Sequence, residues 1–414
     1  MGGIDGLRAT DLVKNTPKVL NLKDSMKVLF LVSWYPMNGR SGNGIFAIRQ
    51  AEALAQAYSR SGRPVSVDVM AVQPRSWTGG KVQRQGVFSN PPNHLQEGSV
   101  RHWVQSYRDG LGGGFSLLVQ VLAWIRLLSA YRRHHGDLPT VVVAQVAWKA
   151  AVVALFLGRP YGIVEHWSGY LEEKIPMKPF PQFLARWAFR KARSVAAVSR
   201  WLADAVSNFY SGLKVSTLPN VIEAIHGVPS DGEEPLRDPR VFLHVSDLAP
   251  VKNPALLFGA WVQSGLAEEG YRLRVAGEYS PESRSAYSLV KGVDWLGILS
   301  PPELCYQLKS SRALLLTSHR ETFSLLAAEA LLNGCALWTS YRPLQVFYQG
   351  LPGLVPLSDD QQITWSKALQ ETITKDFFPW NNAEAMHRVQ ERLKGYRTEE
   401  AGEAMLNWID GWRP

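Results

Sequence analysis

Cysteine is scarce in this sequence, and its scarcity excludes several classes of protein. The two cysteines, Cys305 and Cys335, each lie inside an apolar run. This position is typical of small core residues in a reducing compartment and argues against a disulfide framework. The pair also lacks the spacing of a metal-binding cluster. We therefore expect a cytoplasmic protein without structural disulfides or a resident metal.

Long hydrophobic runs are missing as well. The first 25 residues are polar and lack the apolar core of a signal peptide, so we expect a disordered extension over 1–25. The longest apolar stretch, residues 115–128, is interrupted by Gln120 and Arg126. It is shorter than the ~20 residues that a bilayer span needs. The pattern predicts a core helix rather than a membrane span.

Negative charge is in deficit. The chain has 45 lysines and arginines against 36 aspartates and glutamates, a net charge of +9. Such an excess favours an anionic partner such as nucleic acid, anionic lipid or a phosphorylated substrate, although basic residues that only solvate the surface explain it equally well. Because no nucleic-acid recognition motif accompanies the charge, we expect no nucleic-acid partner.

The 414 residues suit two domains of roughly 200 residues each. Apolar runs that alternate with helical spacing predict parallel strands at 28–33, 65–72, 141–144, 163–166, 195–199, 241–246, 273–277, 293–297, 313–318 and 336–339. Such runs indicate α/β domains with sheets covered on both faces, whose ligands bind beyond the carboxyl ends of the strands. We place the domains at 26–219 and 220–395, with a C-terminal helix at about 396–414 returning to the first domain.

Residues 313–334 are the most informative segment, because they predict a strand, a short turn and a helix. Thr322 or Ser324 is a candidate N-cap, and Gly334 is a candidate C-terminal stop. The unpaired backbone N–H groups at a helix N-terminus suit a diphosphate. Glu321 would lie in the turn and Glu329 inside the helix, where carboxylates can bind the hydroxyls of a sugar and a ribose. Two glutamates on a surface helix remain the alternative.

This segment resembles the signature of the retaining family 4 glycosyltransferases, a group 1 family with the GT-B fold of two Rossmann-like domains around a cleft. In that signature a glutamate, seven residues and a second glutamate precede a short apolar stretch and a glycine. The resemblance covers most of the chain from Met26, in the family's order, at residues 33–36, 42–46, 165–169, 218–221, 241–261, 273–278, 295–297 and 353–356.

The resemblance implies a metal-independent hexosyltransferase without a cofactor. The donor would be a UDP-sugar or GDP-sugar, and the acceptor a hydroxyl of a glycan or lipid-linked intermediate of polysaccharide synthesis. His166 would contact the donor sugar, Lys252 would neutralise the departing diphosphate, and Glu321 would hold sugar hydroxyls. The implied donor-binding set is Gly44, Lys252, Gly277, Glu278, Leu299, Phe323, Ser324, Leu325 and Glu329. The glycines Gly42 and Gly44 would let the backbone approach the donor.

One position departs from the family pattern. An arginine normally lies five residues before the lysine, where this chain has Asp247. The substitution removes one of two cations expected to stabilise the leaving group. Arg320 and Arg200 are candidate replacements by position, and His319 is a second candidate histidine because it is close to Glu321. An inactive homologue that binds a sugar nucleotide and a nucleotide-sugar epimerase of similar architecture stay open as alternatives.

A basic and aromatic stretch at 174–193 is the last feature of note. Arg186, Arg190, Lys191 and Arg193 alternate there with Phe183, Trp187 and Phe189. Basic amphipathic helices with aromatic residues suit anionic membrane surfaces. The alternative is an ordinary helix of an α/β layer, with its aromatic residues against the sheet and its arginines in water.

Overall fold

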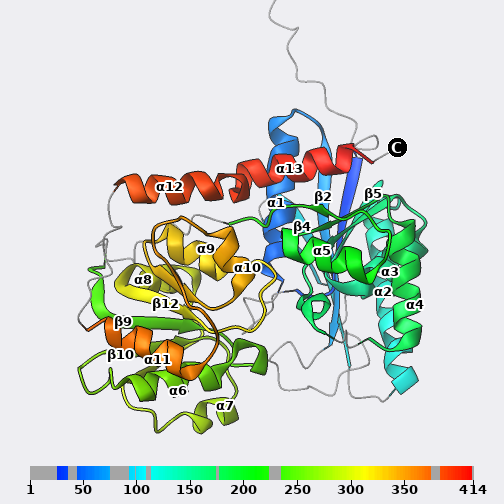
Figure 1. Ribbon diagram of the computed structural model, residues 1–414. Helices are drawn as coiled ribbons and strands as arrows, with labels where there is room; N and C mark the ends of the chain where they lie inside the picture. The colour runs from blue at the N-terminus through cyan, green and yellow to red at the C-terminus, as the bar shows by residue number, and fades with distance from the viewer. Residues whose placement is uncertain are drawn as a thin grey trace, which may run out of the picture.

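The chain folds into two α/β domains, each built on its own sheet (Figure 1). The computed structural model describes residues 26–35, 44–74, 93–97, 99–108, 113–173, 177–222, 235–373 and 383–412. The first sheet ends at residue 217, and the second begins at residue 238. The predicted fold class, two doubly wound Rossmann-like domains, is confirmed.

The first sheet has the strand order β3-β4-β2-β1-β5-β6-β7-β8. Every pairing is parallel except that of β3 with β4. The central strands β1 and β5 are almost wholly buried, as continuous apolar runs require. The strands are β1 (Met26–Val32), β2 (Val65–Pro74), β3 (Asn93–Glu97), β4 (Val100–Tyr107), β5 (Val141–Gln145), β6 (Tyr161–Glu165), β7 (Ser194–Ala197) and β8 (Ser216–Thr217).

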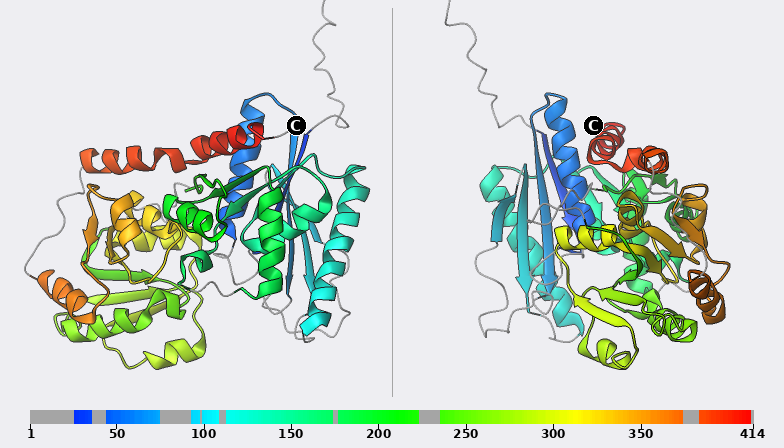
Figure 2. Two further views of the ribbon diagram at one scale, coloured as in Figure 1. Left: turned by 45° about the vertical axis from the view of Figure 1, so that its right-hand side comes forward. Right: turned by 90° about the vertical axis from the view of Figure 1, so that its left-hand side faces the viewer.

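Helices cover both faces of this sheet. Helices α2, α3 and α4 lie on the face turned away from the second domain, whereas α1 lies on the face turned toward it (Figures 1 and 2). The helices of this domain are α1 (Ile45–Arg60), α2 (Gly113–His135), α3 (Ala147–Leu157), α4 (Pro179–Lys191) and α5 (Arg200–Phe209), with a 3₁₀ turn at Ser168–Leu171.

The second sheet has the strand order β11-β10-β9-β12-β13-β14, and its pairings are all parallel. Its strands are β9 (Asp238–Val245), β10 (Arg272–Ala276), β11 (Val293–Gly297), β12 (Ser311–Leu316), β13 (Ala336–Thr339) and β14 (Leu354–Pro356). Its helices are α6 (Pro254–Ser264), α7 (Pro281–Ala286), α8 (Pro301–Ser310), α9 (Leu325–Leu332), α10 (Arg342–Phe347) and α11 (Gln362–Glu371), with 3₁₀ turn η4 at Pro250–Lys252. Cys305 and Cys335 are both buried here, as predicted for core residues.

The C-terminal helices return from the second domain to the first. Helix α12 (Ala383–Leu393), a 3₁₀ turn at Lys394–Tyr396 and helix α13 (Thr398–Asp410) run across both domains in Figure 2. Helix α13 packs closely on α1, because a Cβ at Gly402 would lie 2.3 Å from the Ala53 carbonyl oxygen. The Arg63 guanidinium also contacts the Asp410 carboxylate at 2.8 Å.

Helix α2 differs from the predicted core helix. Its inner face is buried at Val119, Ala123, Leu127 and Tyr131, but a row of apolar side chains on its outer face is exposed: Leu118, Val121, Leu122 and Ile125. Periodicity could not reveal this, because the helix is apolar around most of its circumference between residues 115 and 128. A search of the described residues for a helix long and apolar enough to cross a bilayer finds none.

Candidate functional site

The loop that follows β12 forms the centre of the candidate site. It connects β12 to α9 at the carboxyl edge of the second sheet. The Thr317 hydroxyl donates to the Lys252 carbonyl oxygen at 2.7 Å, and the His319 amide donates to the Val251 carbonyl at 2.9 Å. These bonds join the loop to the turn η4. Lys252 and Glu321, 69 positions apart in the chain, are thereby brought together.

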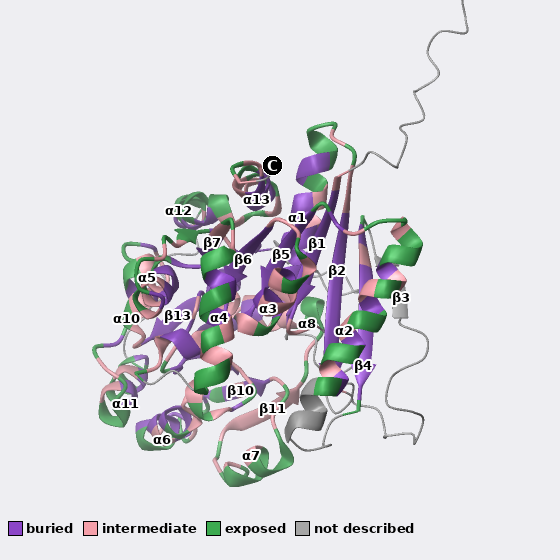
Figure 3. Ribbon diagram, turned by 90° about the vertical axis from the view of Figure 1, so that its right-hand side faces the viewer, coloured by how far each residue is buried: buried purple, intermediate pink, exposed green. Residues whose placement is uncertain are grey.

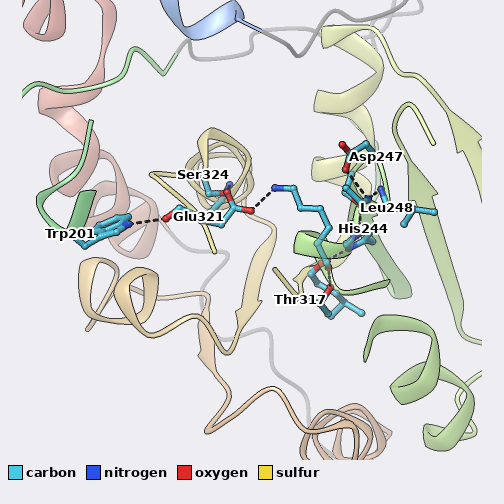
Figure 4. A network of polar contacts seen from close by, with 12 residues as sticks. Trp201, His244, Asp247, Leu248, Thr317, Glu321 and Ser324 are labelled. Carbon is cyan, nitrogen blue, oxygen red and sulfur yellow. Dashed lines mark hydrogen bonds and ion pairs between the residues drawn. The ribbon is translucent and has the colours of Figure 1, made fainter. Parts of the chain in front are cut away.

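The Lys252 ammonium contacts the Glu321 carboxylate at 2.7 Å. Burial lowers the pKa of Lys252, but the neighbouring Glu321 carboxylate more than compensates and raises it above the ordinary value. The first domain holds the same loop, because the Trp201 indole at the start of α5 donates to the Glu321 carbonyl at 2.8 Å. Figure 4 shows Glu321 between Trp201 and the loop that carries Asp247 and Leu248.

Helix α9 begins directly after this pair. Ser324 has a left-handed backbone (φ 62°), and its hydroxyl accepts a hydrogen bond from the Ala327 amide at 3.4 Å. No acceptor among the described residues takes the backbone N–H groups of Leu325 and Leu326. The Phe323 side chain is buried and stacks on Tyr396 at 4.8 Å between ring centroids. The unpaired donors and the helix dipole favour an anion at this end.

Glu329, inside α9, has a partner that the sequence did not reveal. Its carboxylate contacts the Arg49 guanidinium of α1 at 3.0 Å, and the two side chains are only 7% and 10% exposed. The ion pair therefore joins the two domains through a buried contact. Nothing in the pattern of α1 distinguishes an inward-facing arginine from a surface one, so sequence reasoning could not find Arg49.

His166 lies at the end of β6 and is buried. Its Nε2 is 2.7 Å from Oε1 of Gln145, at the end of the neighbouring strand β5. Its ring stacks on Phe46, in the first turn of α1, at a centroid distance of 4.1 Å. Burial lowers the pKa of His166 to about 3, so the imidazole is neutral across the physiological range.

Gly44, just before α1, has a local structural requirement. Its φ is 81°, and a Cβ on it would lie 2.2 Å from the Trp34 carbonyl oxygen. Only glycine fits where the chain leaves β1 and enters α1. Gly42 lies outside the described residues, so the structure gives no position for it.

Comparison with known protein families finds a match in the second half of the chain. Residues 231–343 match the family described as "Glycosyl transferases group 1". The chain therefore contains a group 1 glycosyltransferase domain in its second half. Sequence comparison with curated proteins finds no match.

Solved structures of glycosyltransferases share its fold. Sucrose-phosphate synthase from Thermosynechococcus elongatus superposes with a TM-score of 0.69 at 15% identity, over 93% of this chain and 98% of the other. The UDP-forming α,α-trehalose-phosphate synthase from Burkholderia vietnamiensis gives 0.62 at 12% identity, over 93% and 100%. The catalytic domain of Arabidopsis thaliana starch synthase IV, bound to ADP and acarbose, gives 0.59 at 11%, over 93% and 98%.

The remaining predicted donor-binding residues of the glycosyltransferase lie along the same edge of the second sheet. Gly277 follows β10, with φ 129°, and a Cβ there would lie 2.1 Å from the Ser246 carbonyl oxygen. Its amide donates to the Gly297 carbonyl at the end of β11 at 2.7 Å. Glu278 is exposed beside it, and Leu299 is half-buried in the loop before α8.

Asp247 has a structural function that an arginine could not perform. Its carboxylate accepts a hydrogen bond from the Ala249 amide at 3.0 Å and so shapes the turn before Lys252. Neither predicted replacement cation is free. Arg320 contacts Glu172 of the first domain at 3.3 Å, and Arg200, with its side chain 84% exposed, pairs with Asp204.

Two further predictions concern His319 and metals. The His319 imidazole points toward Asp360, with Nδ1 at 3.2 Å from the carboxylate. Across the described parts of the chain, no group of three or more histidine, cysteine and acidic side chains is arranged to bind a metal. Metal independence stays a prediction.

Proposed function

We propose that this glycosyltransferase moves a sugar from a nucleoside diphosphate donor to an acceptor hydroxyl with retention of the anomeric configuration and without a metal. The contact between Lys252 and Glu321 at the N-terminus of α9 supports this proposal most strongly. A cation, unpaired amides and a carboxylate meet there within one loop. Cation and amides suit a diphosphate, and the carboxylate suits sugar hydroxyls.

In the proposed reaction, the bond between the anomeric carbon and the diphosphate oxygen breaks as the acceptor oxygen attacks from the same face. The acceptor proton passes to an oxygen of the departing diphosphate. Lys252 and the first amides of α9 stabilise the charge that develops on that group, an effect worth several kcal/mol for each well-placed donor. Glu321 orients the sugar. Catalysis then depends on positioning and electrostatics.

The Lys252 ammonium must change partners during this cycle. Without a donor it is neutralised by Glu321 at 2.7 Å. A bound diphosphate brings more negative charge than one carboxylate, so it would attract the ammonium and leave Glu321 free to accept hydrogen bonds from sugar hydroxyls. Glu329 would likewise bind the ribose, either while it keeps its contact with Arg49 or after that contact breaks.

Thermal stability with nucleotides tests this proposal. The purified protein is melted with UDP, GDP, ADP and their common sugar conjugates. Saturation at about 100 times the dissociation constant should stabilise the native state by roughly 2.7 kcal/mol. Glu329→Ala should lose the effect, and Glu269→Ala, an exposed site of the same domain, should keep it. No response to any nucleotide would overturn the donor site, and binding without transfer to any acceptor would favour the inactive homologue.

We also propose that the first domain attaches peripherally to the inner face of an anionic membrane, where lipid-linked acceptors are held. Helices α2, α3 and α4 contain no acidic residue, and their basic residues are Arg126, Arg132, Arg133, Lys149, Arg186, Arg190 and Lys191. Figure 3 shows exposed stretches of α2 and α4 on this side. Large apolar side chains are exposed on the same helices: Leu118, Val121, Leu122, Ile125, Phe156, Phe180, Phe183 and Trp187.

Helix α4 only partly follows the reading as an ordinary helix of an α/β layer. Phe189 is buried against the sheet, but Phe180 and Phe183 are 65% and 64% exposed. Trp187 is half-exposed and meets Phe156 of α3 at 6.0 Å between centroids. Exposed apolar side chains on helices whose charged residues are all basic suit a bilayer with anionic headgroups.

Vesicle flotation tests the attachment. The protein should float with phosphatidylglycerol vesicles at low salt and not with phosphatidylcholine vesicles. The double variant Phe183→Ser/Trp187→Ser should lose binding. Leu289→Ser, which removes an apolar side chain that is 95% exposed on the second domain, should not. Equal flotation of wild type and the double variant would overturn the proposal.

A further inference from the structure

A chain of three side-chain hydrogen bonds runs from His166 to the junction between the domains. Nε2 of His166 is 2.7 Å from Oε1 of Gln145, and Nε2 of Gln145 donates to Oε1 of Gln50 at 2.7 Å. Nε2 of Gln50 then donates to the Pro219 carbonyl oxygen at 2.9 Å. All three side chains belong to buried residues, so water does not compete for these bonds.

The last group in this chain fixes the direction of every bond. A carbonyl oxygen can only accept, so the atom of Gln50 that faces Pro219 must be its amide nitrogen. The oxygen of Gln50 then faces Gln145 and requires a donor, which is the amide nitrogen of Gln145. The oxygen of Gln145 is therefore turned toward His166 and can only accept. Nε2 of His166 must carry the proton.

The other ring nitrogen of His166 is left as an acceptor. Because burial keeps the imidazole neutral, with its pKa lowered to about 3, a proton on Nε2 leaves a lone pair on Nδ1. No described residue hydrogen-bonds to Nδ1. The adjacent Glu165 carboxylate accepts the backbone amides of His166 and Trp167 at 2.9 Å each. Stacking on Phe46 fixes the plane of the ring.

We propose that Gln145 and Gln50 are positioning residues that hold His166 in its neutral Nε2–H tautomer, so that Nδ1 accepts a hydrogen bond from a hydroxyl of the donor sugar. The inference rests on the proposed function for the identity of the ligand, but the tautomer follows from the hydrogen-bond chain together with the burial of the ring. A lone pair at this position attracts a hydroxyl and repels a carboxylate.

Nitrogen NMR of protein labelled at the histidine rings tests the tautomer directly. His166→Asn identifies the His166 signals. In the wild type we expect a protonated Nε2 and an unprotonated Nδ1. Gln50→Leu removes the group that orients Gln145, and it should give a mixture of tautomers. Gln145→Glu puts a carboxylate beside Nε2, and it should protonate both nitrogens. Gln370→Leu, at an exposed site on α11, should change nothing.

The outcomes separate the tautomer from the proposed function. A wild-type His166 protonated at Nδ1, or a tautomer unaffected by both glutamine substitutions, would overturn the proposed positioning of His166 by Gln145 and Gln50, whether or not the enzyme is active. With the tautomer as expected, a saturating donor sugar should shift the Nδ1 signal, and Gln50→Leu should raise the donor KM at least about fivefold. An Nδ1 signal unchanged by a bound donor would overturn the sugar contact. Absence of any donor binding, with the tautomer intact, would count against the proposed function.

Discussion

The buried ion pair between Arg49 and Glu329 offers a sharp quantitative test, because it connects the domains and includes the residue proposed to bind ribose. Removing one partner of such a pair leaves an uncompensated charge and typically costs about 3–5 kcal/mol. With side chains 10% and 7% exposed, we expect Arg49→Met to lower the free energy of unfolding by about 3 kcal/mol. Arg49→Met/Glu329→Gln should lose less than the sum of the two single variants.

Urea unfolding followed by tryptophan fluorescence measures these differences. Arg63–Asp410 is the matched control, since it joins α13 to the first domain at 2.8 Å with side chains 33% and 27% exposed. Arg63→Met should therefore cost at most about 1 kcal/mol. If Arg49→Met costs no more than that, the Arg49–Glu329 contact is not a buried stabilising pair, and our argument from its burial fails.

Nucleotide binding by the same variants adds a second criterion. Arg49→Met leaves the Glu329 carboxylate in place, so it should still bind a nucleoside diphosphate. Glu329→Gln should bind it more weakly, because a neutral amide is a poorer acceptor for ribose hydroxyls than a carboxylate is. Equal losses of binding in both variants would mean that Glu329 acts only through domain closure and does not contact the ribose.

Four further predictions concern the loops of the site. Lys252→Met should lower kcat about 100- to 1,000-fold. Because the folded-state pKa of Lys252 is raised, its stabilising pair should persist from neutral pH to about 10 and be lost as the pH rises through that pKa, which a pH series of unfolding measurements checks. Gly44→Ala should destabilise by more than about 1 kcal/mol, since a Cβ there would meet the Trp34 carbonyl, and an unchanged melting temperature would refute this. If a second cation is missing from the site, Asp247→Arg should lower the donor KM about tenfold, even though the hydrogen bond to the Ala249 amide is lost. An unchanged KM would show that residue 247 does not face the donor.

The ten strands predicted from apolar runs are all strands in the structure. Nine of them are internal to their sheets, where strands of parallel sheets are buried on both faces, and the tenth, β11, is a half-buried edge strand. The remaining strands of the structure do not coincide with an apolar run in the sequence. Strands β8 and β14 have two and three residues. Strand β4 includes the buried polar residues His102 and Gln105, and His102 is paired with the Tyr35 hydroxyl at 2.9 Å. A strand whose buried positions are polar does not have the periodicity that predicts it.

The local part of the site could be predicted and the part made between domains could not. A strand, a turn and a helix suffice to place Glu321 before the N-terminus of α9. The partners Arg49 and Trp201 come from the other domain, and no spacing along the chain encodes such a contact. The same holds for Gln145, which accepts the hydrogen bond from His166. Its side chain reaches His166 only because β5 and β6 pair side by side in the sheet.

Residues 44–50, at the start of α1, take part in both of these groups of contacts, the ones at Glu329 and the ones at His166. Gly44 permits the turn, Phe46 stacks on His166, and Arg49 contacts Glu329. Gln50 donates a hydrogen bond to the Pro219 carbonyl and accepts one from Gln145. A rigid helix carries all three side chains, so a shift of the first domain relative to α9 would disturb the histidine and the glutamate contacts together. If a donor displaces Arg49 from Glu329, as proposed, the position of His166 should change with it, because both contacts depend on the first two turns of α1. In the proposed function, the start of α1 would couple ribose binding at Glu329 to sugar binding at His166.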